Sequence, residues 1–460
     1  MTRFSLFLLA AAAAAPSALA LCADLKAKLA AVSIAELASD ARLTASTGLP
    51  EQMHLSLTGD ATEMYVTFVV NASAACADAA VSIDGGAASF AAAHSTYSAG
   101  VVGWYGSIYT ATLTGLVPGS AHTYVATACG GSAAPVTFTA ALAPAASLRS
   151  RVAVKADMGT VIPLGFETAA QIEKDNAASP FDMVLLAGDL SYATVDPPHN
   201  ELEEIWDAWG RLIEPYCSKA PFMPNVGNHE HTPGTLTNSS GTFNVDYAAY
   251  MARYAAVPRT GNGNLWYSFN HGPVHYTFID SEEDQSPGSP QLTWILNDLA
   301  AVDRSLTPWV VMAQHRPLLC STQSEAGDHV PDGKFLRNLE PALLANKVDL
   351  FLTGHEHLYE RMHSVNNGTV VARADASNNN TMTDPPAPVY VVQGTAGAFV
   401  GGDWMQPQPA WSAVRNGETY GYGIMEFSTA GGMRVMNYAF KTIAGTVLDA
   451  FTIKKTVAAA

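Results

Sequence analysis

Seven side chains that can bind metal ions lie in five short blocks of the chain. They offer carboxylate, phenol, amide and imidazole donors, and they are Asp157, Asp189, Tyr192, Asn228, His315, His355 and His357. Seven ligands exceed what one first-row ion takes, but they suit two ions that share Asp189. Oxygen and nitrogen donors without a thiolate favour iron, manganese or zinc. Two ions about 3.5–4 Å apart are a known arrangement for the hydrolysis of phosphate esters.

Each block follows an apolar run that is typical of a buried strand. These runs span residues 152–156, 183–187, 222–226, 309–313 and 349–353, with a further strand at 389–392. Helices are expected at 201–213 and 291–300, and this alternation predicts an α/β domain. Ligands bind at the carboxyl ends of strands in such sheets, and glycines beside most blocks would let the backbone approach a shared centre. We therefore expect the seven side chains to meet at one edge.

The blocks resemble those of the purple acid phosphatases, which belong to the calcineurin-like metallophosphoesterases. They read Asp-x-Gly, Gly-Asp-x-x-Tyr, Gly-Asn-His-Glu, His-Arg-Pro and Gly-His-x-His, in that order. Tyr192 is the diagnostic residue, because most calcineurin-like enzymes lack it. Segments 265–270 and 272–276 also match the family, so the resemblance covers nearly the whole chain. It implies an α/β (α+β) sandwich of mixed sheets flanked by helices over residues 146–460.

Residues 50–145 have a different pattern, in which Gly and Pro separate short runs rich in Val, Thr, Tyr and Phe. Regular short strands without a helical period predict an all-β sandwich. This part is similar to the fibronectin type III-like module that precedes the catalytic domain in the larger purple acid phosphatases. Residues 21–49 are expected to form a helical leader.

The resemblance also implies how the ligands divide between an Fe(III) ion and a divalent Fe, Zn or Mn ion. The ferric ion would take Asp157, Tyr192 and His357, the second ion Asn228, His315 and His355, and both would share Asp189. Hard anionic ligands stabilise the ferric state, while neutral imidazoles and an amide favour a divalent ion. The implied reaction is the hydrolysis of phosphate monoesters in acid, by in-line attack of a metal-bound hydroxide.

The same resemblance implies supporting roles for the two residues that follow Asn228. His229 would stabilise or protonate the leaving group, and Glu230 would orient the ligands around it.

The chain departs from the family pattern at the His-His pair that some plant-type members carry about ten residues beyond the equivalent of His315. Residues 319–325 contain no histidine here, and the next one is His329.

The first twenty residues predict a secretory signal peptide with cleavage near Ala20, because Arg3 precedes an apolar run and an Ala-Leu-Ala site. Together with this leader, four N-glycosylation sequons predict a secreted glycoprotein, either extracellular or vacuolar/lysosomal. The sequons lie at Asn71, Asn238, Asn367 and Asn379. Five cysteines allow at most two disulfides. We predict Cys76–Cys129 and Cys217–Cys320, which leaves Cys22.

The composition excludes several other classes of protein. A net charge of −17 argues against nucleic-acid partners and against docking on anionic lipid, and no later run reaches the length of a membrane span.

The local charge of the metal site differs from the net charge of the chain. An Fe(III) and a divalent ion would bring a charge of +5 to the site, and the three anionic ligands would bring −3, which leaves about +2. Small phosphate monoesters therefore remain the expected partners, because attraction at contact distance outweighs screened surface charge.

Two alternatives remain open at this point. One is a secreted phosphodiesterase or nucleotide pyrophosphatase on the same scaffold, which Tyr192 disfavours only weakly. The other is a non-catalytic binding protein that uses the β-sandwich and in which the metal site is vestigial. The sequence lacks none of the seven ligands, which favours a working site.

Overall fold

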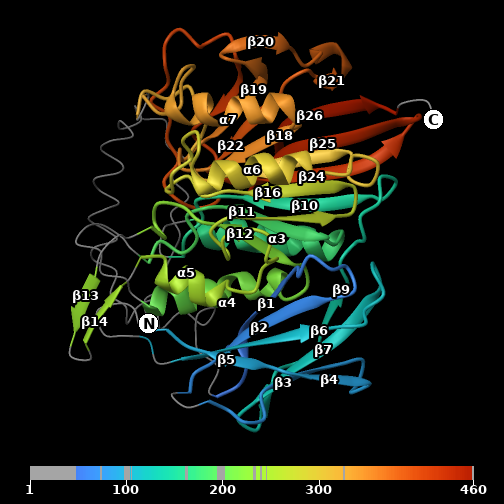
Figure 1. Ribbon diagram of the computed structural model, residues 1–460, viewed down its shortest axis with the longest axis vertical. Coiled ribbons are helices and arrows are strands. Elements are labelled where there is room, and N and C mark those ends of the chain that lie inside the picture. The colour runs from blue at the N-terminus through green and yellow to red at the C-terminus, as the bar shows by residue number, and fades with distance from the viewer. Residues whose placement is uncertain are drawn as a thin grey trace.

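The structure is a computed structural model that describes residues 48–72, 75–97, 104, 106–160, 164–193, 203–231, 235–238, 241–244, 246–324 and 327–457. The predicted signal peptide, the predicted leader up to residue 47 and Cys22 lie outside these residues. The N-terminal strands, residues 51–139, lie at one end of the long axis and residues 359–383 lie at the other, while the C-terminal strands return to the region between them (Figure 1).

The first part of the chain, here called the N-terminal sandwich, consists of two antiparallel sheets, as the sequence pattern predicts. One sheet has the order β1 (Glu51–Ser56), β2 (Met64–Val70), β6 (Ser107–Leu113) and β5 (Ala93–Ser95). The other contains β4 (Ala88–Ala91), β3 (Ala80–Ile83), β7 (Ala121–Ala128), β8 (Gly131–Ser132) and β9 (Val136–Thr139). Val66, Phe68 and Val81 are fully buried in the shared core. The predicted Cys76–Cys129 disulfide is present.

The rest of the chain, here called the α/β sandwich, is built on two mixed sheets (Figure 1). The first has the order β12 (Phe222–Asn225), β11 (Met183–Ala187), β10 (Ser150–Lys155), β24 (Gly421–Ala430), β25 (Met433–Thr442), β26 (Val447–Thr456) and β21 (Thr381–Thr383). The second has β15 (Tyr267–His271), β16 (Val274–Phe278), β17 (Trp309–Ala313), β18 (Leu350–Thr353), β22 (Val389–Gln393), β19 (Tyr359–Asn366) and β20 (Thr369–Ala372), with β23 (Ser412–Asn416) paired to β19. All six predicted strands are present within one or two residues of their expected ends.

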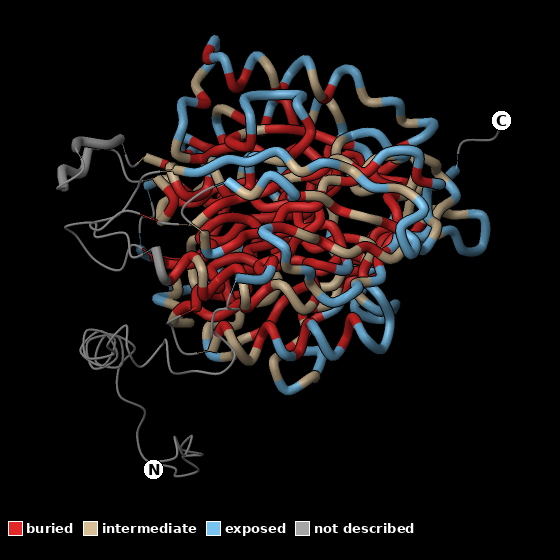
Figure 2. The backbone as a smooth tube through the Cα atoms, turned by 90° about the horizontal axis from the view of Figure 1, so that it is seen from below, coloured by how far each residue is buried: buried red, intermediate tan, exposed pale blue. Residues whose placement is uncertain are grey.

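Both faces of each central strand are buried, so the apolar runs are continuous rather than alternating. On β10, Val152 and Val154 belong to the large core that also contains Val311 of β17, whereas Ala153 belongs to a separate core beneath the helices. Figure 2 shows this buried interior as a continuous band through the molecule.

Helices cover the two outer faces of the α/β sandwich. One side carries α3 (Gly165–Ala178), α4 (Glu203–Cys217) and α5 (Ala248–Arg253), and the other carries α6 (Pro290–Ala300) and α7 (Lys334–Ala345). A small hairpin pairs β13 (Thr235–Asn238) with β14 (Gly241–Asn244). Among the residues that the structure describes, no helix is long and apolar enough to cross a membrane.

The predicted Cys217–Cys320 disulfide is wrong, because both thiols are free and buried. Cys217 ends α4 and packs in the core on that side, whereas Cys320 packs in the core beneath α6 and α7. Both sheets lie between these two cores. The spacing of the cysteines in the sequence contains no information about this separation.

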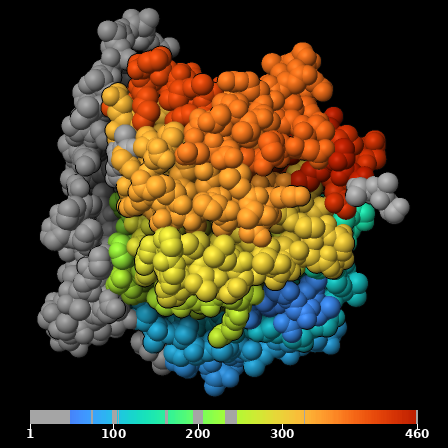
Figure 3. Space-filling model, turned by 45° about the horizontal axis from the view of Figure 1, so that its top comes forward, coloured from blue at the N-terminus to red at the C-terminus, as the bar shows by residue number. Residues whose placement is uncertain are grey.

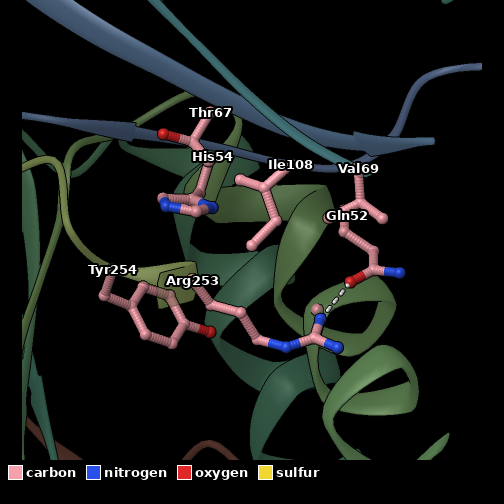
Figure 4. A pocket seen from close by; sticks show the side chains of 8 residues that line it. Gln52, His54, Thr67, Val69, Ile108, Arg253 and Tyr254 are labelled. Atoms are coloured by element: carbon pink, nitrogen blue, oxygen red, sulfur yellow. Dashed lines mark hydrogen bonds between the residues drawn. The ribbon is translucent and has the colours of Figure 1, made fainter. Parts of the chain in front are cut away.

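The N-terminal sandwich packs against the α/β sandwich through β1, whose six residues are all buried. The backbone N–H of Gln52 donates to the carboxylate of Glu214 on α4 at 2.8 Å, and Arg211 on the same helix contacts the carboxylate of Glu51 at 2.6 Å. Figure 4 shows a pocket at this interface, where Arg253 Nη1 lies 3.0 Å from Gln52 Oε1. The two sandwiches are in direct contact at one end of the molecule (Figure 3).

Candidate metal centre

The seven predicted ligands come together where the carboxyl ends of strands from both sheets face each other. The first sheet supplies Asp157 after β10, Asp189 and Tyr192 after β11, and Asn228 after β12; the second supplies His315 after β17, and His355 and His357 after β18. Parallel strands place their carboxyl ends at one edge, so ligands that are distant in sequence become neighbours.

The innermost ligands are Asp157, Asp189 and His315. These three side chains are at most 1% exposed, and their potential ligand atoms all lie within 4.8 Å of one another. His315 Nε2 lies 3.2 Å from Asp189 Oδ2 and 3.9 Å from Asp157 Oδ1. Buried charges normally require partners or a metal ion, so a pair of buried carboxylates beside an imidazole fits a cation site.

The other ligands extend this centre in two directions. On one side, Tyr192 Oη lies 3.1 Å from Asp157 Oδ1 and 2.9 Å from His357 Nε2. This side therefore gathers the phenol, a carboxylate and one imidazole.

On the other side, the amide of Asn228 lies between two histidines. Its Oδ1 is 3.0 Å from His315 Nε2 and 2.8 Å from His355 Nδ1. This side therefore gathers an amide and two imidazoles.

Four of the seven ligands have left-handed backbone conformations. The φ angles are 57° at Asp157, 52° at Asp189, 54° at Tyr192 and 69° at His355. Such conformations are uncommon for residues other than glycine and cost on the order of 1–3 kcal/mol each, so they persist only where the surrounding structure holds them. The strand ends therefore turn sharply to direct these side chains toward one centre.

Two glycines next to the ligands have no room for a side chain. A Cβ atom on Gly227 would lie 2.2 Å from Asp189 Oδ1, and one on Gly354 would lie 2.3 Å from Asp157 Oδ2. Such distances are far below van der Waals contact, so the two carboxylates occupy the space that a larger residue would fill.

The electrostatics of the centre favour positive charge. Burial alone would lower the pKa of His315, but the carboxylates of Asp189 and Asp157 raise it to about 10. Burial would raise the pKa of Asp189, but the positive charges of His315 and His229 hold it below its usual range. Burial and both carboxylates raise the pKa of Tyr192 well above its usual value. Since bound metal ions supply positive charge to such anionic sites, the buried Asp and His side chains fit a metal site.

His229 and Glu230 occupy different positions around the centre. The His229 side chain is 30% exposed, and its ring lies 4.3 Å from the Tyr192 ring, between centroids. Glu230 is buried and accepts hydrogen bonds from the backbone N–H groups of Asp189, Leu190 and Gly227, at 2.9–3.0 Å. Glu230 thus joins the loop after β11 to the loop after β12, whereas His229 faces the accessible side.

The structure adds one contact at the centre and one buried carboxyl group that the sequence motifs did not indicate. Arg316, next to His315, places Nη1 3.1 Å from His355 Nε2 and is paired with Glu282. Asp280 is fully buried after β16, and burial raises its pKa to about 7. The strand-end rule applied to β16 would have found Asp280, but no short motif marks the Arg316 contact.

Other candidates lie apart from the centre. His329 is buried, with Nε2 3.1 Å from Thr322 Oγ1. Asn71, Asn367 and Asn379 are exposed, and Asn238 lies in β13.

Comparisons with known proteins gave concordant matches over most of the chain. Three family models match consecutive parts of the chain. The model described as "Purple acid Phosphatase, N-terminal domain" matches residues 50–140, and the model described as "Calcineurin-like phosphoesterase" matches residues 150–359. The model described as "Iron/zinc purple acid phosphatase-like protein C" matches residues 387–450.

Individual relatives show the same pattern. Purple acid phosphatase 18 of Arabidopsis thaliana is 30% identical over 386 residues, which cover 83% of this chain and 79% of that protein. A phosphoenolpyruvate phosphatase of Allium cepa is 32% identical over 53% of this chain and 49% of its own length. The structure of a purple acid phosphatase from yellow lupin (Lupinus luteus) seeds is similar in fold, with a TM-score of 0.77 and 24% identity, over 89% of this chain and 75% of that one.

Proposed function

Because the chain is a metallophosphoesterase that belongs to the purple acid phosphatase family, we propose that it is a secreted acid phosphatase that hydrolyses phosphate monoesters. The observation that carries this proposal is the convergence of Tyr192, Asp157 and His357 beside the Asn228 and His315 pair. A phenol in contact with a carboxylate and an imidazole fits a ferric site next to a divalent one.

The proposed ligand sets follow the two directions of the centre. Asp157, Tyr192 and His357 would hold Fe(III), Asn228, His315 and His355 would hold a divalent Fe, Zn or Mn ion, and Asp189 would serve both. When bound, the ions would supply Lewis acidity toward the phosphate oxygens and a water of lowered pKa as the nucleophile.

The chain's own residues would orient the substrate and manage protons. His229 is the proposed group beside the leaving oxygen, because it is partly exposed next to Tyr192 and within 3.9 Å of Asp189. A cationic imidazole there would stabilise or protonate the departing alkoxide. Glu230 would hold Asp189 and Asn228 in fixed positions relative to each other, because it accepts hydrogen bonds from three backbone N–H groups of their two loops.

Secretion and glycosylation are part of the same proposal. A disulfide between Cys76 and Cys129 fits an oxidising compartment. Sequons at Asn71, Asn367 and Asn379 are on the surface and accessible to a glycan, and Asn238 is proposed as a fourth site.

The test combines metal analysis, a visible spectrum and paired substrates. Purified protein should contain two ions per chain, one of them iron, absorb broadly in the visible through tyrosinate-to-iron charge transfer, and release phosphate from an aryl phosphate at acid pH. The rate on an aryl phosphate monoester should exceed that on the matched diester. A colourless protein with two non-ferric ions would refute the Fe(III) assignment, and faster diester cleavage would favour a phosphodiesterase.

A further inference from the structure

An open hollow lies where the turn before β21 meets the beginning of β26. Its volume is about 370 Å³, within the range of small-molecule sites. The residues that line it are Asn379, Asn380, Val447, Leu448, Asp449 and Ala450. The hollow therefore combines two amide side chains with the first residues of a strand.

The β26 side of this hollow is apolar and exposed. Val447 is 51% exposed and Leu448 is 49% exposed. Among the large apolar side chains that are exposed in the described part of the chain, they are the only two that are adjacent in the sequence. Single exposed apolar side chains are normal, whereas contiguous ones are a candidate contact surface.

The hollow offers no unpaired charge to an ionic ligand. Asp449 is the only charged residue in its lining, and it is buried. Its carboxylate accepts from Tyr359 Oη at 2.7 Å, and from Arg361 Nε and Nη2 at 2.7 and 3.1 Å. Because this charge is already paired within the protein, the hollow fits a neutral ligand that has both polar and apolar faces.

Asn379 is positioned to supply such a ligand. It is exposed, and it begins the sequon Asn379-Asn380-Thr381. Asn380 Nδ2 donates to the carbonyl oxygen of Ala450 at 3.0 Å, and the backbone N–H of Thr452 donates to the carbonyl oxygen of Asn380 at 3.2 Å. These bonds hold the sequon against β26, so a sugar attached to Asn379 would begin in the lining of the hollow.

We propose that the first N-acetylglucosamine of a glycan on Asn379 lies in this hollow and covers Val447 and Leu448. The acetamide methyl group and the C–H face of the sugar ring would contact the two apolar side chains, while the hydroxyl groups would stay in water. This inference rests on the proposed glycosylation, and it gives the glycan at Asn379 the additional role of stabilising the beginning of β26.

The test measures amide hydrogen exchange of residues 447–452 in the glycosylated full chain, with the occupancy of each sequon determined by mass spectrometry. Asn379→Gln removes the glycan and should make these amides exchange about fivefold faster. Asn367→Gln is the matched control, because Asn367 is an exposed sequon residue that does not line the hollow, and it should leave the exchange unchanged. Trimming with an endoglycosidase that leaves one N-acetylglucosamine should also change nothing.

A second variant separates the sugar contact from an effect of the substitution on the turn itself. In a Leu448→Ser background the apolar contact is already lost, so Asn379→Gln should have little further effect. An equal effect in both backgrounds, or equal exchange in wild type and Asn379→Gln when Asn379 is occupied, would overturn this inference alone. Protection that depends on protein concentration instead of the glycan would assign the patch to a second copy of the chain and also overturn it. An unoccupied Asn379 would overturn both the inference and the proposed glycosylation of this site.

Discussion

Glu214 at the contact between the two sandwiches should make stability depend on pH. Burial is the main cause that raises its pKa from 4.5 to about 7, and the nearby Glu51 carboxylate adds to it. Hydrogen bonds from the backbone of Gln52 and Met53 and the charge of Arg211 oppose this increase. The folded state therefore binds a proton at Glu214 more tightly than the unfolded chain does.

The sign and size of the effect follow from this difference. The stabilisation is fully present below pH 4.5 and is lost as the pH rises through about 7, because the carboxylate must ionise in a partly desolvated site. A pKa difference of 2.5, from 4.5 to about 7, corresponds to about 3 kcal/mol. Partial exposure of the side chain reduces the expected loss to about 2 kcal/mol.

The perturbation is Glu214→Gln, which keeps an oxygen acceptor for the backbone N–H groups of β1 but does not titrate. Urea unfolding of both proteins at several pH values between 4.5 and 8 gives the difference in unfolding free energy at each pH. The unfolding free energy of the variant should rise by about 2 kcal/mol relative to that of wild type across this range. Asp280, whose pKa is also raised, is present in both proteins and therefore contributes equally to both curves. Glu418→Gln, at an exposed position, should show no trend. Parallel curves for wild type and Glu214→Gln would refute the reasoning.

Three other changes probe the centre and the N-terminal sandwich. Tyr192→Phe should abolish the visible band while the second ion stays bound, because the phenol is the proposed source of the colour; a coloured variant would contradict this. His229→Ala should lower kcat by about 10²–10⁴-fold for a poor leaving group and much less for an activated aryl phosphate, and equal losses on both would remove its proposed role. Replacing Cys76 and Cys129 by Ser opens a loop of 53 residues and should cost about 4 kcal/mol of stability, measured by urea unfolding, whereas an unchanged midpoint would show that the disulfide contributes nothing.

Much of the architecture follows from periodicity in the sequence. The continuous apolar runs before the ligand blocks predict strands buried on both faces, and the structure places them in two facing sheets with the ligands at their carboxyl ends. The buried Asp157, Asp189 and His315 lie together as the strand-end rule predicts. Which ion each ligand holds, and the boundaries of the domains, stay predictions.

What the sequence could not supply is contact between segments that no motif connects. The predicted pairing of Cys217 with Cys320, two cysteines of the same predicted domain, is wrong because they lie on opposite sides of two sheets. The Arg316–His355 contact depends on how the loop after β16 holds Glu282. Such contacts are set by tertiary packing, which short-range patterns do not record.

The pairing of β10 with β24 has a consequence for synthesis of the chain. Ser150 of β10 pairs with Phe427 of β24, so one edge of this central strand has no partner until the last part of the chain has been made. At about 5–20 residues per second, the ribosome needs tens of seconds to reach the partner strand. During that time an apolar edge is open to other nascent chains. We therefore expect the two-sheet fold to close only after translation is nearly complete.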